Sequence, residues 1–262
     1  MTSPDGTTIA YDKAGTGPAL ILVAGAFGYR KYPMLPKLVA ALSDRFTVYN
    51  YDRRGRGDST DTRPYAVQRE IEDLQALVQA AGGEAHVWGQ SSGAALALHA
   101  AAADIGIRSL ALYQPPFRVD HSKPLPPADF QKHLNTLVAE GNRSAAVRYM
   151  MTKGMGAPGF AVGVMRLLPL WKRLTGLAHT LPYDVAIVDD KIYGKPLEAA
   201  DFADVKVPTL VMAGGKAPEL LRTGARQLAG ILPDGKYQVL DGQSHAVSPA
   251  ALKPALTSFF QQ

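Results

Sequence analysis

The sequence predicts a single α/β domain in which a mostly parallel β-sheet is covered by helices on both faces and interrupted by a helical insertion. Short apolar or β-branched runs alternate with longer helical patterns up to residue 117, and the same alternation returns from residue 201. Residues 118–200 carry helical patterns without a convincing strand. A chain of 262 residues is long enough for one large domain of this kind.

Apolar runs that end in turn residues define the predicted sheet. The expected strands are residues 7–11, 19–23, 45–51, 85–89 and 109–113 before the insertion, and 209–213 and 237–240 after it. Helices are expected at 92–103, near 129 and 171, at 220–228 and near 250–260. We expect residues 1–117 and 201–262 to form the core and residues 118–200 to form a helical lid over it.

One further helix, before Gly82 and Gly83, is indicated by apolar residues at helical spacing, and the glycines end it. Its expected apolar face comprises Ile71, Leu74, Leu77, Val78 and Ala81. The charged residues expected on its other faces are Arg69, Glu70, Glu72 and Asp73.

The composition is that of a globular protein, with 47% hydrophobic and 19% charged residues. The net charge of +5 comes from scattered side chains, and the only tight basic group is Arg53, Arg54 and Arg56. Nucleic-acid binding usually needs a basic face within a recognisable module, so we expect no nucleic-acid partner. The basic group is interpreted as mild basicity without a partner.

Several classes of site and location are disfavoured. The chain has no cysteine, which excludes disulfides and thiolate chemistry and fits a reducing cytoplasm. Residues 1–10 are polar and lack a signal-peptide pattern, and no apolar run approaches the roughly 18 residues of a membrane span. No metal-ligand constellation or phosphate-binding glycine loop is evident, so we expect no cofactor and no metal. Nothing in the sequence indicates an oligomeric state.

The segment Gly89-Gln90-Ser91-Ser92-Gly93 has the spacing G-x-S-x-G at a predicted strand-to-helix junction. A serine on such a tight turn needs nearly side-chain-free residues two positions before and after it, which Gly89 and Gly93 provide. Its hydroxyl then projects above the sheet, close to the first N–H groups of the following helix, where an oxyanion is favoured. The pattern therefore indicates Ser91 as a nucleophile.

With three other segments, this motif resembles the α/β-hydrolase superfamily over nearly the whole chain. The segment at 51–59 is similar to the D-x-R-G-x-G-x-S loop, Val207-Pro208-Thr209-Leu210-Val211 to the strand after the lid, and Gly242-Gln243-Ser244-His245 to the catalytic-histidine loop. The resemblance implies an α/β-hydrolase fold with a nucleophile elbow at Ser91. In such relatives the triad follows the chain order serine, acid, histidine, which makes His245 the general base for Ser91.

The resemblance also implies an oxyanion hole formed by backbone N–H groups. Relatives usually open the relevant loop with His-Gly, whereas this chain has Ala24-Gly25-Ala26. Because the donor is an amide, Ala26 can still supply it, paired with the N–H of Ser92. The replacement of His by Ala24 removes a polar side chain that normally braces this loop.

The third member of the triad departs from the family pattern. Ala217 stands where the acid is expected after the strand that follows the lid, and Gln114 stands at the alternative position before the lid. Gln114 could accept a hydrogen bond from His245 and orient its ring without stabilising its charge. Alternatively, Asp241 or Glu219 could supply the charge, or the reaction is not acyl transfer and needs no strong base.

These residues favour a serine hydrolase acting on a small ester, thioester or lactone, weakened by the neutral Gln114. The alternatives are a non-hydrolytic enzyme on the same scaffold, such as a cyclase, lyase or isomerase, and a catalytically silent small-ligand binder. Relatives with dehalogenase or epoxide hydrolase chemistry use an aspartate where Ser91 stands. Apolar lid residues favour an apolar or aromatic substrate, with these as candidate lining: Phe117, Phe130, Met150, Met151, Met155, Phe160, Met165 and Trp171.

Overall fold

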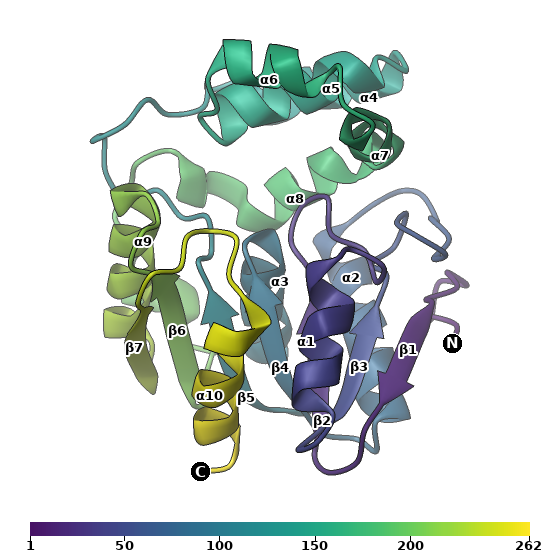
Figure 1. Ribbon diagram of the computed structural model, residues 1–262, viewed down its shortest axis with the longest axis vertical. Helices are drawn as coiled ribbons and strands as arrows, with labels where there is room; N and C mark the ends of the chain where they lie inside the picture. The colour runs from purple at the N-terminus through teal and green to yellow at the C-terminus, as the bar shows by residue number, and fades with distance from the viewer.

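A seven-stranded sheet forms the centre of the molecule (Figure 1). The computed structural model describes all residues from Met1 to Gln262. Its strands are β1 (Tyr11–Ala14), β2 (Ala19–Val23), β3 (Thr47–Tyr51), β4 (Ala85–Gln90), β5 (Ile107–Tyr113), β6 (Thr209–Gly214) and β7 (Gly235–Leu240). The spatial order is β1-β3-β2-β4-β5-β6-β7, and all neighbours are parallel except β1 and β3. The predicted mostly parallel α/β sheet is confirmed.

Helices cover both faces of this sheet, and each face has its own apolar core. The helices are α1 (Met34–Leu42), α2 (Val67–Ala80), α3 (Ser92–Ala102), α4 (Phe130–Ala139), α5 (Arg143–Tyr149), α6 (Gly159–Met165), α7 (Leu170–Gly176), α8 (Leu181–Val188), α9 (Glu219–Ile231) and α10 (Pro249–Phe260). Helices α1 and α10 bury apolar side chains against one face. Helices α2, α3 and α9 bury theirs against the other. None of these helices is long and apolar enough to cross a membrane.

The chain between β5 and β6 contains helices joined by loops and no strand, and its residues 118–200 are called the helical insertion. It contains α4–α8, a single π-helical turn at Met150–Gly154, and 3-10 turns at Ala178–Thr180, Asp189–Ile192 and Ala199–Phe202. Figure 1 shows α4–α7 stacked beyond the end of the sheet where the parallel strands finish, with α8 between them and α3. The insertion therefore lies over the edge of the sheet where ligands bind in open α/β folds.

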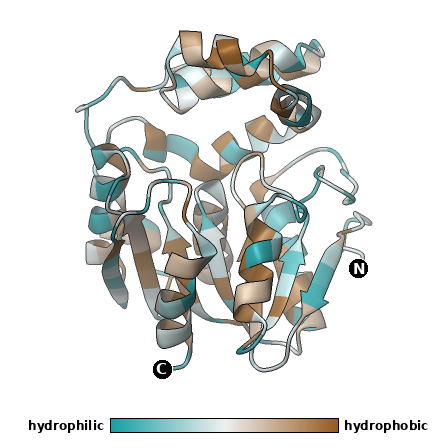
Figure 2. Cartoon of the chain, viewed as in Figure 1, coloured by the Kyte–Doolittle hydropathy of each residue, from teal (hydrophilic) through white to brown (hydrophobic).

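The strands that the apolar pattern predicts clearly are those that are buried on both faces of the sheet. The central strands β2, β4 and β6 are almost fully buried, as expected for strands covered on both faces. In Figure 2 apolar residues are concentrated on these central strands, whereas the edge strand β1 is largely hydrophilic. The strand β1 pairs only with β3, beginning with Tyr11 opposite Tyr51.

The beginning of the chain differs from prediction. Residues 7–11 do not form the opening strand: β1 starts at Tyr11, and Thr8 forms only an isolated bridge with Thr2. Thr7 is buried outside the sheet, where its hydroxyl donates to the Thr62 hydroxyl. The local run of β-branched residues predicts a strand that the structure does not form at that position.

Helix α1 was not predicted. It begins after Pro33 and contains Pro36 in its first turn, where a missing N–H costs no helical hydrogen bond. Prolines usually indicate the end of a helix, so a helix that has them in its first turn is not evident from the sequence. Its apolar residues Leu35, Leu38 and Leu42 are buried against the sheet.

Candidate active site

Ser91 occupies the turn between β4 and α3 in a strained backbone conformation. Its φ is 55° and its ψ is −127°, a region that L-residues rarely enter. Holding a residue there costs about 1–3 kcal/mol, and such strain tends to accumulate at functional sites. The Ser91 N–H donates to the carbonyl oxygen of Tyr113 at 2.9 Å, so this turn continues the contact between β4 and β5.

Three glycines allow neighbouring backbone segments to approach this turn. A Cβ at Gly93 would lie 2.3 Å from the carbonyl oxygen of Val23, and one at Gly89 would lie 2.6 Å from that of Gly93. A Cβ at Gly25 would lie 2.8 Å from the Cβ of Ser91. Side chains at these positions would clash, since atoms so close must move apart. In the G-x-S-x-G spacing, Gly93 therefore reflects contact with the end of β2 and Gly89 reflects contact with the start of α3.

Gln114 and His245 are in contact, and Gln114 follows the strand that pairs with the one before Ser91. Gln90 lies opposite Tyr113 in the parallel pair β4–β5, so Ser91 and Gln114 follow at the same level. The Nδ1 atom of His245 lies 2.7 Å from Oε1 of Gln114. The side-chain amide of Gln90 donates to the carbonyl oxygen of His245 at 3.0 Å, which ties the histidine loop to the strand that carries Ser91.

The surroundings of the His245 imidazole favour its neutral form. Burial lowers the pKa of His245 below its usual 6.5, because burial disfavours the imidazolium ion. Gln114 is fully buried, and its Nε2 has no hydrogen-bond partner. The alternative acids lie elsewhere: Asp241 is exposed, and the exposed Glu219 pairs with Arg222. The ring contact is thus made with an amide and not with a carboxylate.

The segments that carry Ala26 and Ser92 converge on the same point. Residues 24–28 form a tight turn in which the Gly28 N–H donates to the Gly25 carbonyl oxygen at 3.0 Å, and Phe27 has a positive φ of 61°. Ser92 is the first residue of α3, so its N–H has no acceptor within the helix. The 24–28 turn lies against Ser91, since a Cβ at Gly25 would be 3.5 Å from the Ser91 Oγ.

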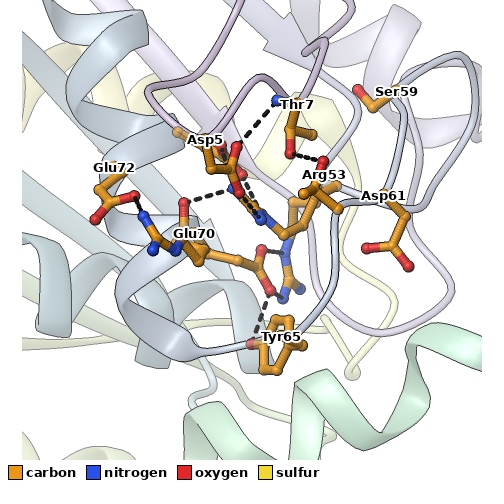
Figure 3. Close-up of polar contacts among 12 residues, drawn as sticks. Asp5, Thr7, Arg53, Ser59, Asp61, Tyr65, Glu70 and Glu72 are labelled. Carbon is orange, nitrogen blue, oxygen red and sulfur yellow. Dashed lines mark hydrogen bonds and ion pairs between the residues drawn. The ribbon is translucent and has the colours of Figure 1, made fainter.

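The basic group at residues 53–56 is buried, so it offers no basic surface. Arg53, Arg54 and Arg56 are each at most 1% exposed. Figure 3 shows the Arg53 guanidinium facing the Glu70 carboxylate, which it contacts with two hydrogen bonds of 2.7 Å, and Tyr65 donating to Glu70 at 3.0 Å. Ion pairing makes such burial tolerable.

The same pairing overturns the expected polar faces of α2. Glu70 and Asp73 were expected away from the buried face, yet they are 2% and 1% exposed. Asp73 forms two hydrogen bonds of 2.8 Å with Arg54. A further buried acid, Asp184 of α8, was missed in the sequence, because its partners lie about 130 positions away and no local motif marks it.

Two expected lining residues of the helical insertion point outward. Phe160 is 81% exposed and Met155 is 48% exposed, whereas Phe117, Phe130 and Met150 are packed into the core. Side-chain type alone does not reveal which face of a short helix is covered. The apolar lining expected from these residues is therefore smaller than predicted.

Cavities lie on two sides of the helical insertion. One, of about 1060 Å³, is bounded by α4, α8 and the loop at residues 63–65, and neither Ser91 nor His245 lines it. A second, about 410 Å³, is lined by Phe27 of the 24–28 turn, by Leu174 of α7 and by Pro249, and Ser91 and His245 do not line it either. No group of three or more His, Cys, Asp or Glu side chains is arranged to hold a metal ion.

Comparison with known proteins gives a consistent result. The family model described as "Alpha/beta hydrolase family" matches residues 20–255. An alpha/beta hydrolase from Sphaerobacter thermophilus is 47% identical, with a TM-score of 0.91 and 99% of each chain covered. An enol-lactonase from Burkholderia xenovorans LB400 is 20% identical, with a TM-score of 0.72 and 98% of each chain covered. An esterase from Rhodococcus sp. ECU1013 is 18% identical, with a TM-score of 0.66, 100% of this chain and 97% of the other covered. The chain therefore belongs to the alpha/beta hydrolase family.

Proposed function

We propose that this protein is a serine hydrolase of small apolar esters, thioesters or lactones, with Ser91 as nucleophile and His245 as base. The observation that carries the proposal is the strained Ser91 placed level with Gln114, whose Oε1 lies 2.7 Å from the His245 ring. An activated serine needs a neighbouring base that a third group orients, and in this proposal Gln114 is the group that orients His245.

The first chemical step forms the acyl-enzyme. The Ser91 Oγ attacks the substrate carbonyl carbon while Nε2 of His245 takes the hydroxyl proton. The N–H groups of Ala26 and Ser92 receive the negative charge that develops on the carbonyl oxygen. Collapse of the tetrahedral intermediate breaks the bond to the alcohol, which leaves with the proton from His245. Water then repeats the sequence on the acyl-serine and releases the acid.

Gln114 can orient the His245 ring as a triad acid does, but it cannot stabilise the positive charge of the ring. Its Oε1 accepts from Nδ1–H of His245, which leaves the lone pair of Nε2 facing the serine. An amide carries no charge to stabilise the imidazolium that forms in each step. In a serine protease, the change from acid to amide lowers turnover by about 10⁴-fold. We therefore propose slow hydrolysis, most visible with activated esters.

The substrate class is proposed from the surroundings. The 410 Å³ cavity beside the 24–28 turn is lined mainly by apolar and aromatic side chains, among them Tyr29, Met34 and Leu177. Such a surface favours an apolar group on the substrate. We propose that the helical insertion, residues 118–200, acts as the lid that keeps water from this region. Esterase and enol-lactonase structures that share the fold are consistent with an ester or lactone.

A second candidate is a non-hydrolytic enzyme that uses His245 for proton transfer, as in a cyclase, lyase or isomerase. The observation that favours it is the neutral pairing of His245 with Gln114, since a neutral base needs no charged partner in its resting state. In that case Ser91 would bind substrate without forming a covalent intermediate.

Labelling and turnover of Ser91→Ala test the proposed function. We expect a fluorophosphonate probe to label the wild type slowly and Ser91→Ala not at all, since the hydroxyl is the attacking atom. Turnover of p-nitrophenyl acetate should fall to the buffer rate in the variant. Ser59→Ala, which changes a serine in the 52–59 loop, serves as the control. Labelling that persists in Ser91→Ala would overturn the assignment of the nucleophile.

A further inference from the structure

The proposed oxyanion hole is built from two segments that are far apart in the sequence. Ala26 belongs to the turn after β2, whereas Ser92 begins α3. The N–H groups of Ala26 and Ser92 stabilise an oxyanion only if both point to the same position, because an oxyanion hole acts through preorganised donors. Relatives brace the first segment with a histidine that Ala24 replaces in this chain. Something else must fix that turn.

Asp184 of α8 contacts both segments, directly or through an arginine. Its carboxylate accepts a hydrogen bond of 2.7 Å from the Ser92 hydroxyl. It also accepts hydrogen bonds of 2.9 and 2.8 Å from Nη2 of Arg56 and one of 2.8 Å from Nη1 of Arg53. Asp184 and both arginines are 1% exposed.

The two arginines hold the backbone of the turn. Nη1 of Arg56 donates to the Gly25 carbonyl oxygen at 2.8 Å, and Nη1 of Arg53 donates to that of Ala24 at 3.3 Å. The Gly25 carbonyl and the Ala26 N–H belong to one planar peptide group, in which they point in opposite directions. Holding the Gly25 oxygen therefore fixes the direction of the Ala26 N–H. The charged donor also polarises this peptide and strengthens its N–H as a donor.

The charges in this cluster balance. Two cations, Arg53 and Arg56, face two anions, Glu70 and Asp184. Burial favours the neutral acid, but the charges of Arg56 and Arg53 outweigh burial and lower the pKa of Asp184. Asp184 therefore stays ionised, and its removal would leave both guanidinium groups with only Glu70 as a counter-charge.

We propose that Asp184 is a positioning residue that sets both halves of the oxyanion hole from the helical insertion. It acts through Arg56 on the peptide of Ala26 and through the Ser92 hydroxyl on the start of α3. This inference rests on the proposed function. It adds that the helical insertion supports the chemistry as well as covering it, since α8 carries the residue that joins the two segments.

Asp184→Asn tests this proposal, with Asp73→Asn as the matched control. Both remove one buried carboxylate charge from an arginine of the same loop, but Asp73 pairs with Arg54 and contacts neither segment of the hole. For p-nitrophenyl ester hydrolysis we expect kcat of Asp184→Asn to fall about 10–100-fold with KM within about twofold, which is less than the about 10²–10³-fold cost of removing an oxyanion donor, because the donors are displaced and not removed. Asp73→Asn should change kcat by less than about threefold.

Amide hydrogen exchange gives a readout that does not depend on turnover. Peptides covering residues 20–30 should exchange faster in Asp184→Asn than in the wild type. In Asp73→Asn their exchange rate should equal that of the wild type. Equal acceleration in both variants, or none in Asp184→Asn, would overturn the proposal. If the wild type hydrolyses no ester, the proposed function fails while exchange still decides whether Asp184 holds the turn.

Ser92→Ala provides a milder variant in case Asp184→Asn folds poorly. It keeps the backbone N–H of the hole and removes only the hydroxyl that donates to Asp184. We expect kcat to fall about 3–10-fold with KM unchanged, in line with a shifted donor. A wild-type kcat in Ser92→Ala would contradict the role given to that contact.

Discussion

Replacing Gln114 with glutamate is expected to increase the turnover of p-nitrophenyl esters at least about tenfold, with an upper limit of about 10⁴-fold taken from the reverse change in a serine protease. Glutamate has the shape of glutamine and keeps the oxygen that lies 2.7 Å from Nδ1 of His245. Its charge stabilises the imidazolium ion in both steps. The measurement is kcat for wild type and variant, with Ser91→Ala in each background to remove the background reaction.

The pH profile separates this explanation from a general change in structure. Because burial lowers the pKa of His245 in the wild type, the acidic limb of kcat/KM should lie below pH 6.5. The carboxylate favours the charged ring and raises that pKa, so the limb should move to higher pH in Gln114→Glu. Gln114→Met, which has no acceptor, should lower kcat. An unchanged or abolished activity in Gln114→Glu would show that residue 114 does not orient the base.

Gly93→Ala is expected to destabilise the fold by about 1–3 kcal/mol, the usual cost of overpacking, and to remove most activity. The added Cβ would lie 2.3 Å from the Val23 carbonyl oxygen and 2.7 Å from that of Ala24. Both are backbone atoms at the end of β2 and cannot rotate away. Helix α3 would have to move, taking Ser91 and Ser92 with it.

Gly163→Ala in α6 is the matched control for this substitution. A Cβ at Gly163 meets nothing within 4 Å, so alanine should stabilise the helix by about 0.5–1 kcal/mol and leave activity unchanged. Urea unfolding followed by circular dichroism measures both changes, and ester turnover is recorded in parallel. If Gly93→Ala were as stable and active as Gly163→Ala, the close approach of α3 to β2 would not be needed.

Much of the fold followed from local patterns. The buried strands β2, β4 and β6 are marked by continuous apolar runs, because both of their faces are covered. The edge strand β1 lacks such a run, and its position was predicted wrongly. The contact of Gln114 with His245 was expected from the resemblance to the α/β-hydrolase superfamily, in which some members carry the acid at that position, and the structure shows this contact.

The buried charge cluster could not be predicted in the same way. In sequence, Arg53 and Arg56 look like a solvated basic loop, and Glu70 looks like part of a polar helical face. Their burial depends on Asp184, whose helix reaches them only after the helical insertion folds back over α3. Periodicity reports which residues share a face, but ion pairs across such sequence separations leave no periodic signal.

The strained backbone of residue 91 indicates that folding stability is not the only property that determines the residue at this position. A glycine would adopt its dihedral angles with little strain, so selection for folding free energy alone would not retain a side chain there. A serine that persists at such a cost is the kind of compromise between robustness and activity found where an enzyme needs its hydroxyl. Under the proposed function, the strain at residue 91 is the loss of stability that accompanies presentation of the serine hydroxyl.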